Sequence, residues 1–302
     1  MKILLSIIIF LLNTIVWCQM KVDHLSMITT QVLLLKGDSV VSQGTGFYFI
    51  KQDTTKNSSF ISLVTNYHVI TGSAPDENKE PIGDNIIFYF HKNENYPSEL
   101  KQVRFPLFTK NGKPIWISSS KFPSADIAII PLVSGLYSDC KVFGISEEWA
   151  KNKIVLHPTS TITLVGYPYG FSDTINNLPI WKTGTIASEP LFDFNGKPLF
   201  LVDISAFPGM SGSPAFAVAN GIYEVEPGTM TPGNVRKFLG IYASMQMLEE
   251  KKYLEQLDND KKEGIKISES LELGHIWRSD LIIEIINTID VVKYENDILK
   301  NL

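Results

Sequence analysis

Short apolar runs separated by turn-forming residues dominate the chain from about residue 26 to residue 245. The runs are rich in Val, Ile, Phe, Tyr and Thr, and Gly, Asn, Pro and Asp lie between them, as in "GTGFYFI", "SFISLVT", "TITLVGY" and "KFLGIYAS". Strands spaced this closely are typical of an all-β sandwich or barrel. The dozen or so runs exceed what one small barrel uses, so we expect an all-β fold of two six-stranded antiparallel β-barrels.

The middle of the chain divides these runs into two sets. The stretch "VSGLYSDCKVFGISEEWAKNK" has the texture of a connector, which places the first barrel in residues 19–140 and the second in residues 141–302. An Asn-Gly pair occurs at Asn111 in the first set and at Asn195 in the second, each between strand-like residues. Asn and Gly accept the positive φ of a type I′ turn, so both pairs are candidate hairpin turns.

The end of the chain has a different pattern. Residues 248–264 are highly charged with few apolar positions, which predicts an exposed helix or a mobile surface insertion. The next segment, "SDLIIEIINTI", predicts a C-terminal helix with Ser279 as N-cap and Asp280 in its first turn. One face of that helix would be apolar and would pack against the barrels through Ile282, Ile285, Ile286 and Ile289.

The N-terminus has the layout of a secretory signal peptide. Lys2 precedes an apolar run over residues 3–17, which is shorter than the roughly 20 residues of a spanning helix. Val16 and Cys18 suit the positions before a cleavage site, so we expect a signal peptide over residues 1–18. Export to a periplasm or out of the cell, with no stable membrane anchor after cleavage, is the expectation; a retained anchor is the alternative.

Charge and cysteine content exclude several other classes. The 302 residues carry a formal charge of −5 without a run of Lys or Arg, so no nucleic-acid partner is expected. The chain has two cysteines, and removal of the signal would leave Cys140 alone, without a neighbouring His, as a structural thiol. No His-x-x-x-His or Cys-x-x-Cys spacing supports a metal site. We interpret four histidines as structural or exposed residues, namely His24, His91, His157 and His275.

Three polar residues beside apolar strands form a candidate catalytic set. They are His68 in "LVTNYHVI", Asp126 in "SADIAIIPL" and Ser211 in "PGMSGSP". A serine hydroxyl is a poor nucleophile until a base takes its proton, and the imidazole base needs a third group to hold its tautomer. Each residue alone has an ordinary structural explanation, so the hypothesis depends on their joint occurrence in this order on a β-rich chain.

The turn before Ser211 predicts a second element of the same chemistry. Gly209 permits a backbone conformation that is closed to larger residues. The N–H groups of Gly209 and Ser211 could then point into one small space and bind an oxyanion.

Four of these stretches, "GTGFYFI", "TNYHVI", "ADIAII" and "DISAFPGMSGSPAF", resemble successive landmarks of the trypsin-like (chymotrypsin-fold) serine peptidases. The resemblance runs from about residue 26 to residue 292 and is greatest to the bacterial branch that includes the HtrA proteases. It implies two barrels with a cleft between them, His68 as general base, Asp126 as its orienter and Ser211 as nucleophile. It further implies a protein or peptide substrate and no cofactor.

The sequence departs from the family pattern around the nucleophile. Met210 stands where the family has Asp or Asn, and Ser213 replaces a second glycine and adds a competing hydroxyl. The disulfides of the animal members, an activation cleavage site and room for the PDZ domain of HtrA proteins are not found. We therefore expect no ordering by a newly freed N-terminus and no peptide sensing of the HtrA kind.

Substrate preference is marked by two positions. Alignment with the family places Ser205 at the base of the pocket for the residue before the scissile bond, and Tyr242 in its wall within "GIYAS". Because Ser205 is not acidic, a demand for Lys or Arg is disfavoured, and a neutral, small or apolar residue is expected.

Two other functions remain open at this point. "GMSGS" nearly satisfies the nucleophile elbow of the α/β-hydrolases, but that fold needs a helix after the serine and "SPAFAVA" looks like a strand. A catalytically silent trypsin-like domain that acts as a binding or scaffolding module is the alternative from a different class.

Overall fold

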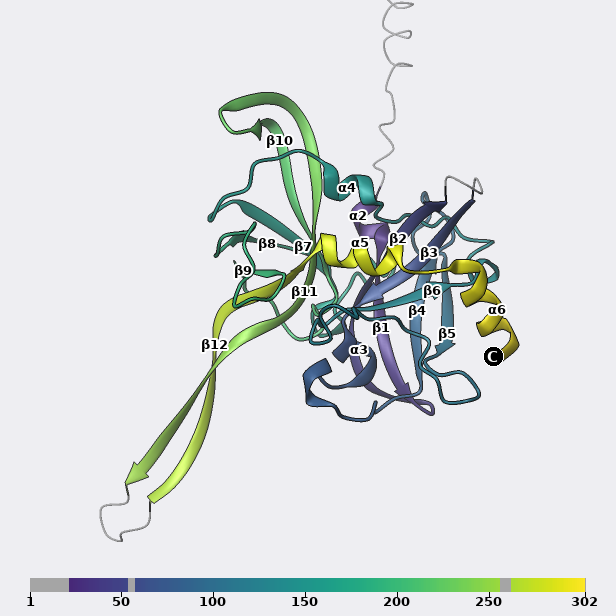
Figure 1. Cartoon of the computed structure of the whole chain (residues 1–302), viewed down its shortest axis with the longest axis horizontal. Helices are drawn as coiled ribbons and strands as arrows, with labels where there is room; N and C mark the ends of the chain where they lie inside the picture. The colour runs from purple at the N-terminus through teal and green to yellow at the C-terminus, as the bar shows by residue number, and fades with distance from the viewer. Residues whose placement is uncertain (1–21, 54–57, 256–261, 302) are drawn as a thin grey trace, which may run out of the picture.

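Two antiparallel sheets of six strands each form the protein, seen in a computed structural model that describes residues 22–53, 58–255 and 262–301 (Figure 1). The first sheet has the strand order β5-β4-β1-β2-β3-β6, and the second closes into a barrel with the order β10-β11-β12-β9-β8-β7. The predicted all-β, chymotrypsin-like architecture is therefore confirmed.

The strands of the first sheet are β1 (Thr29–Lys36), β2 (Ser39–Asp53), β3 (Ser58–Thr65), β4 (Asn85–His91), β5 (Leu100–Pro106) and β6 (Ala128–Leu132). Those of the barrel are β7 (Thr161–Gly166), β8 (Ile180–Ile186), β9 (Leu199–Asp203), β10 (Pro214–Glu226), β11 (Thr229–Glu255) and β12 (Lys262–Arg278). The α-helices are α2 (His24–Ile28), α3 (Tyr67–Thr71), α4 (Glu147–Lys151), α5 (Ser279–Asn287) and α6 (Val291–Asn301). Single 3₁₀ turns are η1 (Pro75–Glu77), η2 (Ser134–Leu136) and η3 (Pro168–Gly170).

The connection between β5 and β6 brings the two edges of the first sheet together. Leu107 continues from β5, and its N–H donates to the carbonyl of Asp84. Farther along, Ile117 exchanges two backbone hydrogen bonds with Ile129 of β6, of 2.8 and 2.9 Å. The first sheet is thus curved around its own core, although β5 and β6 do not pair directly.

Three hydrophobic clusters fill the fold. Strands that lie between the two halves, such as β2, are apolar on both faces and therefore contribute to two clusters. Along β2, Tyr48 lies in the core of the first sheet, whereas Phe47 and Phe49 lie in a cluster shared with the second barrel. Alternation of side chains along a strand accounts for this division. A third cluster, which includes Phe200 and Ile276, fills the barrel itself.

Helix α5 covers the cluster shared by the two halves (Figure 1). The isoleucines predicted for its apolar face are all buried, but only Ile282, Ile285 and Ile286 lie in the helix, because Ile289 follows its end at Asn287. The helix begins one residue earlier than predicted. Arg278 is the N-cap, and Ser279, the predicted N-cap, is the first helical residue. The predicted C-terminal helix is otherwise confirmed.

Both ends of the described chain pack against the half of the molecule to which they do not belong in sequence. At the start, Asp23 accepts a two-pronged hydrogen bond from Arg236 of β11, with distances of 2.7 and 2.5 Å. At the end, α6 was not predicted, and its Tyr294 donates from its hydroxyl to the carbonyl of Ile115 near the first sheet, at 2.8 Å. The strands of the first sheet end at Leu132 and those of the barrel begin at Thr161, whereas each terminal segment contacts the opposite half.

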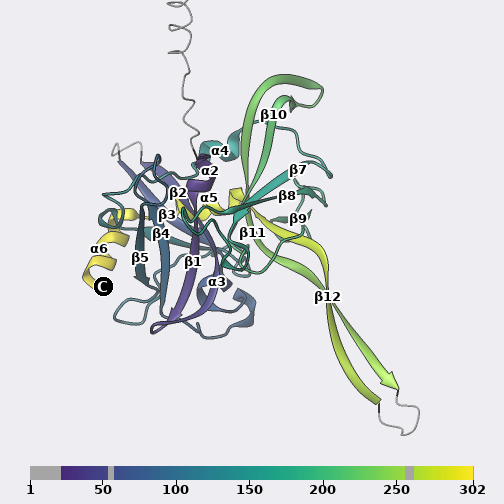
Figure 2. The same ribbon diagram turned by 180° about the vertical axis from the view of Figure 1, so that it is seen from behind.

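The described parts of the charged segment, residues 248–255 and 262–264, are paired strands, so the helix alternative is wrong for them. Strands β11 and β12 continue in register through it, with Leu248 paired to Glu269 and Glu255 to Lys262. The two strands extend far beyond the second barrel in both views (Figures 1 and 2). Low hydrophobicity was a poor guide here, because backbone pairing with a neighbouring strand needs no apolar face.

The two Asn-Gly pairs form different turns. Asn195 and Gly196 both have positive φ, of 53° and 72°, as a type I′ turn requires. At the other pair only Gly112 has positive φ, of 74°, and the N–H of Lys113 donates to the hydroxyl of Thr109. The type I′ prediction is therefore confirmed at Asn195 and wrong at Asn111.

The predicted signal peptide and cleavage site at Cys18 lie outside the described residues. Within those that are described, no helix combines the length and apolar character needed to cross a bilayer.

Replacing Ile282 with alanine should lower the free energy of unfolding by about 2–5 kcal/mol, because the side chain is fully buried in the shared cluster. Urea unfolding followed by circular dichroism measures the change. Asn287→Ala on the exposed part of α5 is the matched control and should cost little. A loss below 1 kcal/mol for Ile282→Ala would contradict the placement of α5.

Lowering the pH should destabilise the fold in part through His91. Burial lowers the pKa of His91 below the ordinary histidine value, although its hydrogen bond to the Pro97 carbonyl acts in the opposite direction. The unfolded chain takes up the proton more readily, so this contribution to stability is complete above a pH of about 6.5 and is lost as the pH falls below it.

The melting temperature of the His91→Asn variant should therefore fall less between pH 7 and pH 5 than that of the unaltered protein. The asparagine amide keeps a donor for Pro97 without a titrating group. His157→Asn, at an exposed position, serves as the control and should leave the pH dependence unchanged. Equal slopes for all three proteins would rule out a role for His91.

Candidate active site

The pairing of β3 with β6 brings two of the three predicted catalytic residues together. Thr65 at the end of β3 lies opposite Ala128 at the start of β6. His68 follows Thr65 in the first turn of α3, and Asp126 precedes Ala128. The register of one strand pair thus places the imidazole beside the carboxylate.

Two hydrogen bonds hold His68 against Asp126. The ring Nδ1 lies 2.6 Å from Oδ2 of Asp126, and the backbone N–H of His68 donates to Oδ1 at 3.0 Å. The buried Asn66 fixes the other side of the aspartate by donating from Nδ2 to its backbone carbonyl at 2.6 Å. Because a carboxylate only accepts, Nδ1 is the donor in this hydrogen bond, and in the neutral form of the ring the lone pair is on Nε2.

Ser211 and helix α3 both lie close to Gly44 of β2. A side chain at Gly44 would meet the Val69 side chain at 2.6 Å and the Ser211 carbonyl oxygen at 3.1 Å. The N–H of Thr45 donates to that carbonyl at 2.8 Å. The serine therefore docks beside α3, which carries His68, and its hydroxyl donates to the carbonyl of Ala243 at 2.8 Å.

Gly209 has the backbone conformation expected from the sequence. Its φ is 93°, and a Cβ at this position would approach the Tyr167 carbonyl to 2.5 Å. The N–H of Tyr169 donates to the carbonyl of Pro208 at 2.6 Å. Since the C=O and N–H of a trans peptide point in opposite directions, the N–H of Gly209 points away from Tyr169.

The remaining amides of this turn divide into two groups. Met210 donates to the Phe207 carbonyl at 3.0 Å, and Gly212 donates to the Tyr242 carbonyl at 2.9 Å. Within the described part of the chain, the N–H groups of Gly209 and Ser211 have no backbone acceptor. These two are the donors predicted for an oxyanion hole, and the turn leaves both available.

The two unusual residues beside the nucleophile are both buried. Met210 is fully buried in the hydrophobic cluster of the second barrel, so it points away from the cleft. Ser213 is also fully buried, with its hydroxyl 4.0 Å from the Met210 sulfur. Neither side chain obstructs the turn, and the Ser213 hydroxyl is shielded from any substrate.

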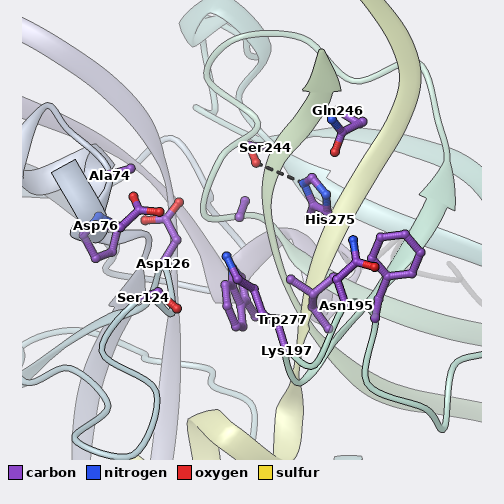
Figure 3. Close-up of a pocket in the computed structure, with 14 residues that line it drawn as sticks. Ala74, Asp76, Ser124, Asp126, Asn195, Lys197, Ser244, Gln246, His275 and Trp277 are labelled. Atoms are coloured by element: carbon purple, nitrogen blue, oxygen red, sulfur yellow. Dashed lines mark hydrogen bonds between the residues drawn. The ribbon is translucent and has the colours of Figure 1, made fainter. Parts of the chain in front are cut away.

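A cavity of about 390 Å³ lies between the two sheets next to this constellation (Figure 3). Asp76 and Asp126 line it from the first half, and His275 and Trp277 from β12 of the second. The other lining residues are Ala74, Pro75, Ser124, Phe194, Asn195, Lys197, Leu199, Ala243, Ser244 and Gln246. Because the Ala243 carbonyl holds the Ser211 hydroxyl, the cavity adjoins the nucleophile.

His275 is a titratable residue in this cavity that sequence reasoning assigned to structure. The hydroxyl of Ser244 lies 3.2 Å from its Nδ1, as Figure 3 shows. Burial, together with the nearby Lys197 charge, lowers the pKa of His275, and a hydrogen bond to the Ser244 backbone acts in the opposite direction. His275 is therefore neutral near pH 7.

The two predicted pocket residues occupy different surroundings. Ser205 is exposed on the loop that follows β9. Tyr242 is only 3% exposed, and its ring packs in the barrel core, where burial raises its pKa well above the ordinary value. The backbone of Tyr242 bonds to Gly212 and Ser213, so this residue supports the nucleophile turn through its main chain.

Burial raises the pKa of the Cys140 thiol, and the neighbouring Asp139 raises it further. The thiolate that nucleophilic chemistry needs is thereby disfavoured. The hypothesis of a structural thiol agrees with this.

Sequence reasoning missed three residues that complete the site: Thr45, Asn66 and Ala243. Thr45 and Asn66 had a signal, since each is a polar residue inside a landmark already identified, "GTGFYFI" and "TNYHVI". Ala243 had none, because it contributes only a carbonyl that any residue carries.

Residues 44–222 match the trypsin-like peptidase domain, so the chain belongs to this family. The resemblance found in the sequence is confirmed. No curated protein matches the chain.

The solved structures to which the chain is similar include three proteases. A serine endoprotease from Yersinia pestis has a TM-score of 0.45 and 13% identity; the match covers 87% of this chain but only 62% of that protein. An inactive mutant of Rv3671c from Mycobacterium tuberculosis H37Rv has a TM-score of 0.42 and 15% identity, with 88% of this chain and 87% of that one covered. A thermostable serine protease, AL20, from an extremophilic microorganism has a TM-score of 0.37 and 13% identity, covering 72% and 93%.

The contact between His68 and Asp126 should give a proton resonance far downfield of the amides in the NMR spectrum, because a short hydrogen bond to a carboxylate deshields the Nδ1 proton. Asp126→Asn should abolish the resonance, whereas Asp76→Asn, at a second carboxylate that lines the same side of the cavity, should leave it in place. A resonance that survives in Asp126→Asn would show that His68 has another partner.

Proposed function

We propose that the protein is an exported serine endopeptidase that hydrolyses peptide bonds through an acyl-enzyme on Ser211. The observation that carries this proposal is the Asp126–His68 hydrogen bond of 2.6 Å beside a serine whose turn leaves two N–H groups available. Membership of the trypsin-like peptidase family supports the reaction class.

The reaction begins with rotation of the Ser211 hydroxyl. In the resting protein the hydroxyl donates to the Ala243 carbonyl, and a change of χ1 between staggered positions turns Oγ and its proton toward Nε2 of His68. His68 takes the proton as Ser211 Oγ attacks the carbonyl carbon of the peptide. Asp126 holds the ring and stabilises the imidazolium that forms.

The tetrahedral intermediate carries its negative charge on the former carbonyl oxygen. The N–H groups of Gly209 and Ser211 are the donors for that oxygen. Collapse of the intermediate breaks the C–N bond, and His68 returns its proton to the leaving amine. A water molecule, deprotonated by His68, then attacks the acyl-enzyme and releases the acid product and the free serine hydroxyl.

The substrate is a protein or peptide that lies in the cleft between the two halves. We propose a neutral, small or apolar residue before the scissile bond, since Ser205 offers no acid for a basic one. The triad chemistry requires no cofactor. Export after cleavage near Cys18 is supported by the sequence of residues 1–18 and places the enzyme in a periplasm or outside the cell.

A fluorophosphonate probe should label Ser211, because only an activated hydroxyl attacks the phosphorus centre. Mass spectrometry of the digested protein locates the adduct. Ser211→Ala should abolish labelling and lower kcat by roughly 10⁶-fold. The matched controls Ser205→Ala and Ser213→Ala should both retain the adduct at Ser211.

The two outcomes separate the peptidase from a silent binding module. A folded protein that takes up no probe would contradict the proposed activity and favour the module. Labelling at Ser205 or Ser213 alone would overturn the assignment of the nucleophile.

A further inference from the structure

Thr45 is a fully buried residue of β2 whose polar groups all contact other parts of the active site. Its N–H donates to the Ser211 carbonyl at 2.8 Å, and its carbonyl accepts from the Thr65 hydroxyl at 2.7 Å. The proposed function does not use the Thr45 hydroxyl. That group nonetheless contacts the turn that would stabilise the intermediate.

The hydroxyl of Thr45 joins two separate segments of the second half. It donates to the carbonyl of Gly209 at 2.8 Å and accepts from the N–H of Tyr167 at 3.0 Å. Since one hydroxyl supplies one proton and two lone pairs, these bonds fix the direction of its hydrogen. The turn around Gly209 and the segment before η3 are thus linked through a side chain of the first half.

This link fixes the direction in which the Gly209 amide points. The Gly209 carbonyl is held by Thr45, and the preceding carbonyl, of Pro208, is held by the N–H of Tyr169. With both flanking carbonyls fixed, the φ and ψ of Gly209 are determined, even though glycine by itself permits several conformations. The N–H of Gly209 then points away from Tyr169 and has no backbone acceptor among the described residues.

The backbone of Tyr169 indicates that the hydrogen bonds of the Thr45 hydroxyl constrain the segment around η3. Tyr169 lies in the left-handed region, with φ of 51° and ψ of 24°, which is uncommon for a residue that is not glycine. Its N–H is the donor to Pro208. Such a conformation persists where its surroundings determine it, and the Thr45–Tyr167 bond lies two residues away.

We propose that Thr45 is a positioning residue, which keeps the Gly209 N–H directed at the developing oxyanion through the hydrogen bonds of its hydroxyl. The inference rests on the proposed function of Ser211 and concerns its efficiency. A valine has the shape of threonine but neither donates nor accepts, so it would free the Gly209 carbonyl and leave the Tyr167 amide without a partner.

The test compares the rate of fluorophosphonate labelling of Ser211 in Thr45→Val with that in the unaltered protein. Varying the probe concentration separates the maximal rate of phosphonylation from the apparent affinity. We expect Thr45→Val to lower the maximal rate by roughly 10²-fold, because one oxyanion donor is misdirected, with affinity changed less than about threefold. Thr45→Ser restores the hydroxyl and should return the rate to within about threefold of the original.

Thr30→Val is the matched control. Thr30 is likewise a buried threonine whose hydroxyl accepts a backbone N–H, from Tyr89 at 2.9 Å, and donates to a backbone carbonyl, that of Gln31. Loss of the Thr30 hydroxyl should not slow the labelling of Ser211. If Thr30→Val slows labelling as much as Thr45→Val, the effect is a general one on the fold and the proposal is wrong.

Thr45→Cys keeps the proposal testable if the valine variant does not fold. A thiol is a weak donor and acceptor, so its labelling rate should fall clearly below that of Thr45→Ser. Equal rates for the Ser and Cys variants, or an unchanged rate in folded Thr45→Val, would overturn the role of Thr45. Absence of labelling in the unaltered protein would instead contradict the proposed activity itself.

Discussion

The burial of apolar side chains between the two halves is the constraint on which the active site depends. Phe47 and Phe49 from one half and Phe216 and Phe238 from the other lie in a single cluster, covered by α5. The catalytic candidates are divided between these halves, with His68 and Asp126 on one and Ser211 on the other. Only a fixed relation between the halves lets the imidazole, the hydroxyl and the oxyanion turn share one small space.

The nucleophile turn shows how the same constraint acts on the backbone. Its carbonyls are fixed from both sides, by Thr45 from the first half and by Tyr169 from the second. Met210 also fixes the turn, because its apolar side chain is buried in the core of the second barrel. A charged residue at this position would instead need an ion-pair partner. Within the described residues, both halves of the fold therefore contribute contacts that hold the turn.

Much of this could be predicted from the sequence, for identifiable reasons. Strand alternation and frequent turns gave the two-sheet architecture, and the periodicity of Ile282, Ile285, Ile286 and Ile289 gave the α5 face. His68, Asp126 and Ser211 stand in short motifs, so they were found without knowledge of the register that joins them. The pairing of residues 248–255 with 262–269 was missed because it depends on backbone hydrogen bonds, which leave little trace in hydrophobicity. The Ala243 carbonyl was unreachable, since any residue could supply it.

The crossing of the chain ends affects how the molecule comes apart. Asp23 is bound to β11 of the barrel, while Tyr294 of the last helix is bound near the first sheet. The barrel cannot unfold without breaking its contact with the N-terminal segment. The first half cannot unfold without breaking its contact with the last helix. We therefore expect the two halves to unfold together, and loss of either terminal segment to weaken the opposite half of the fold.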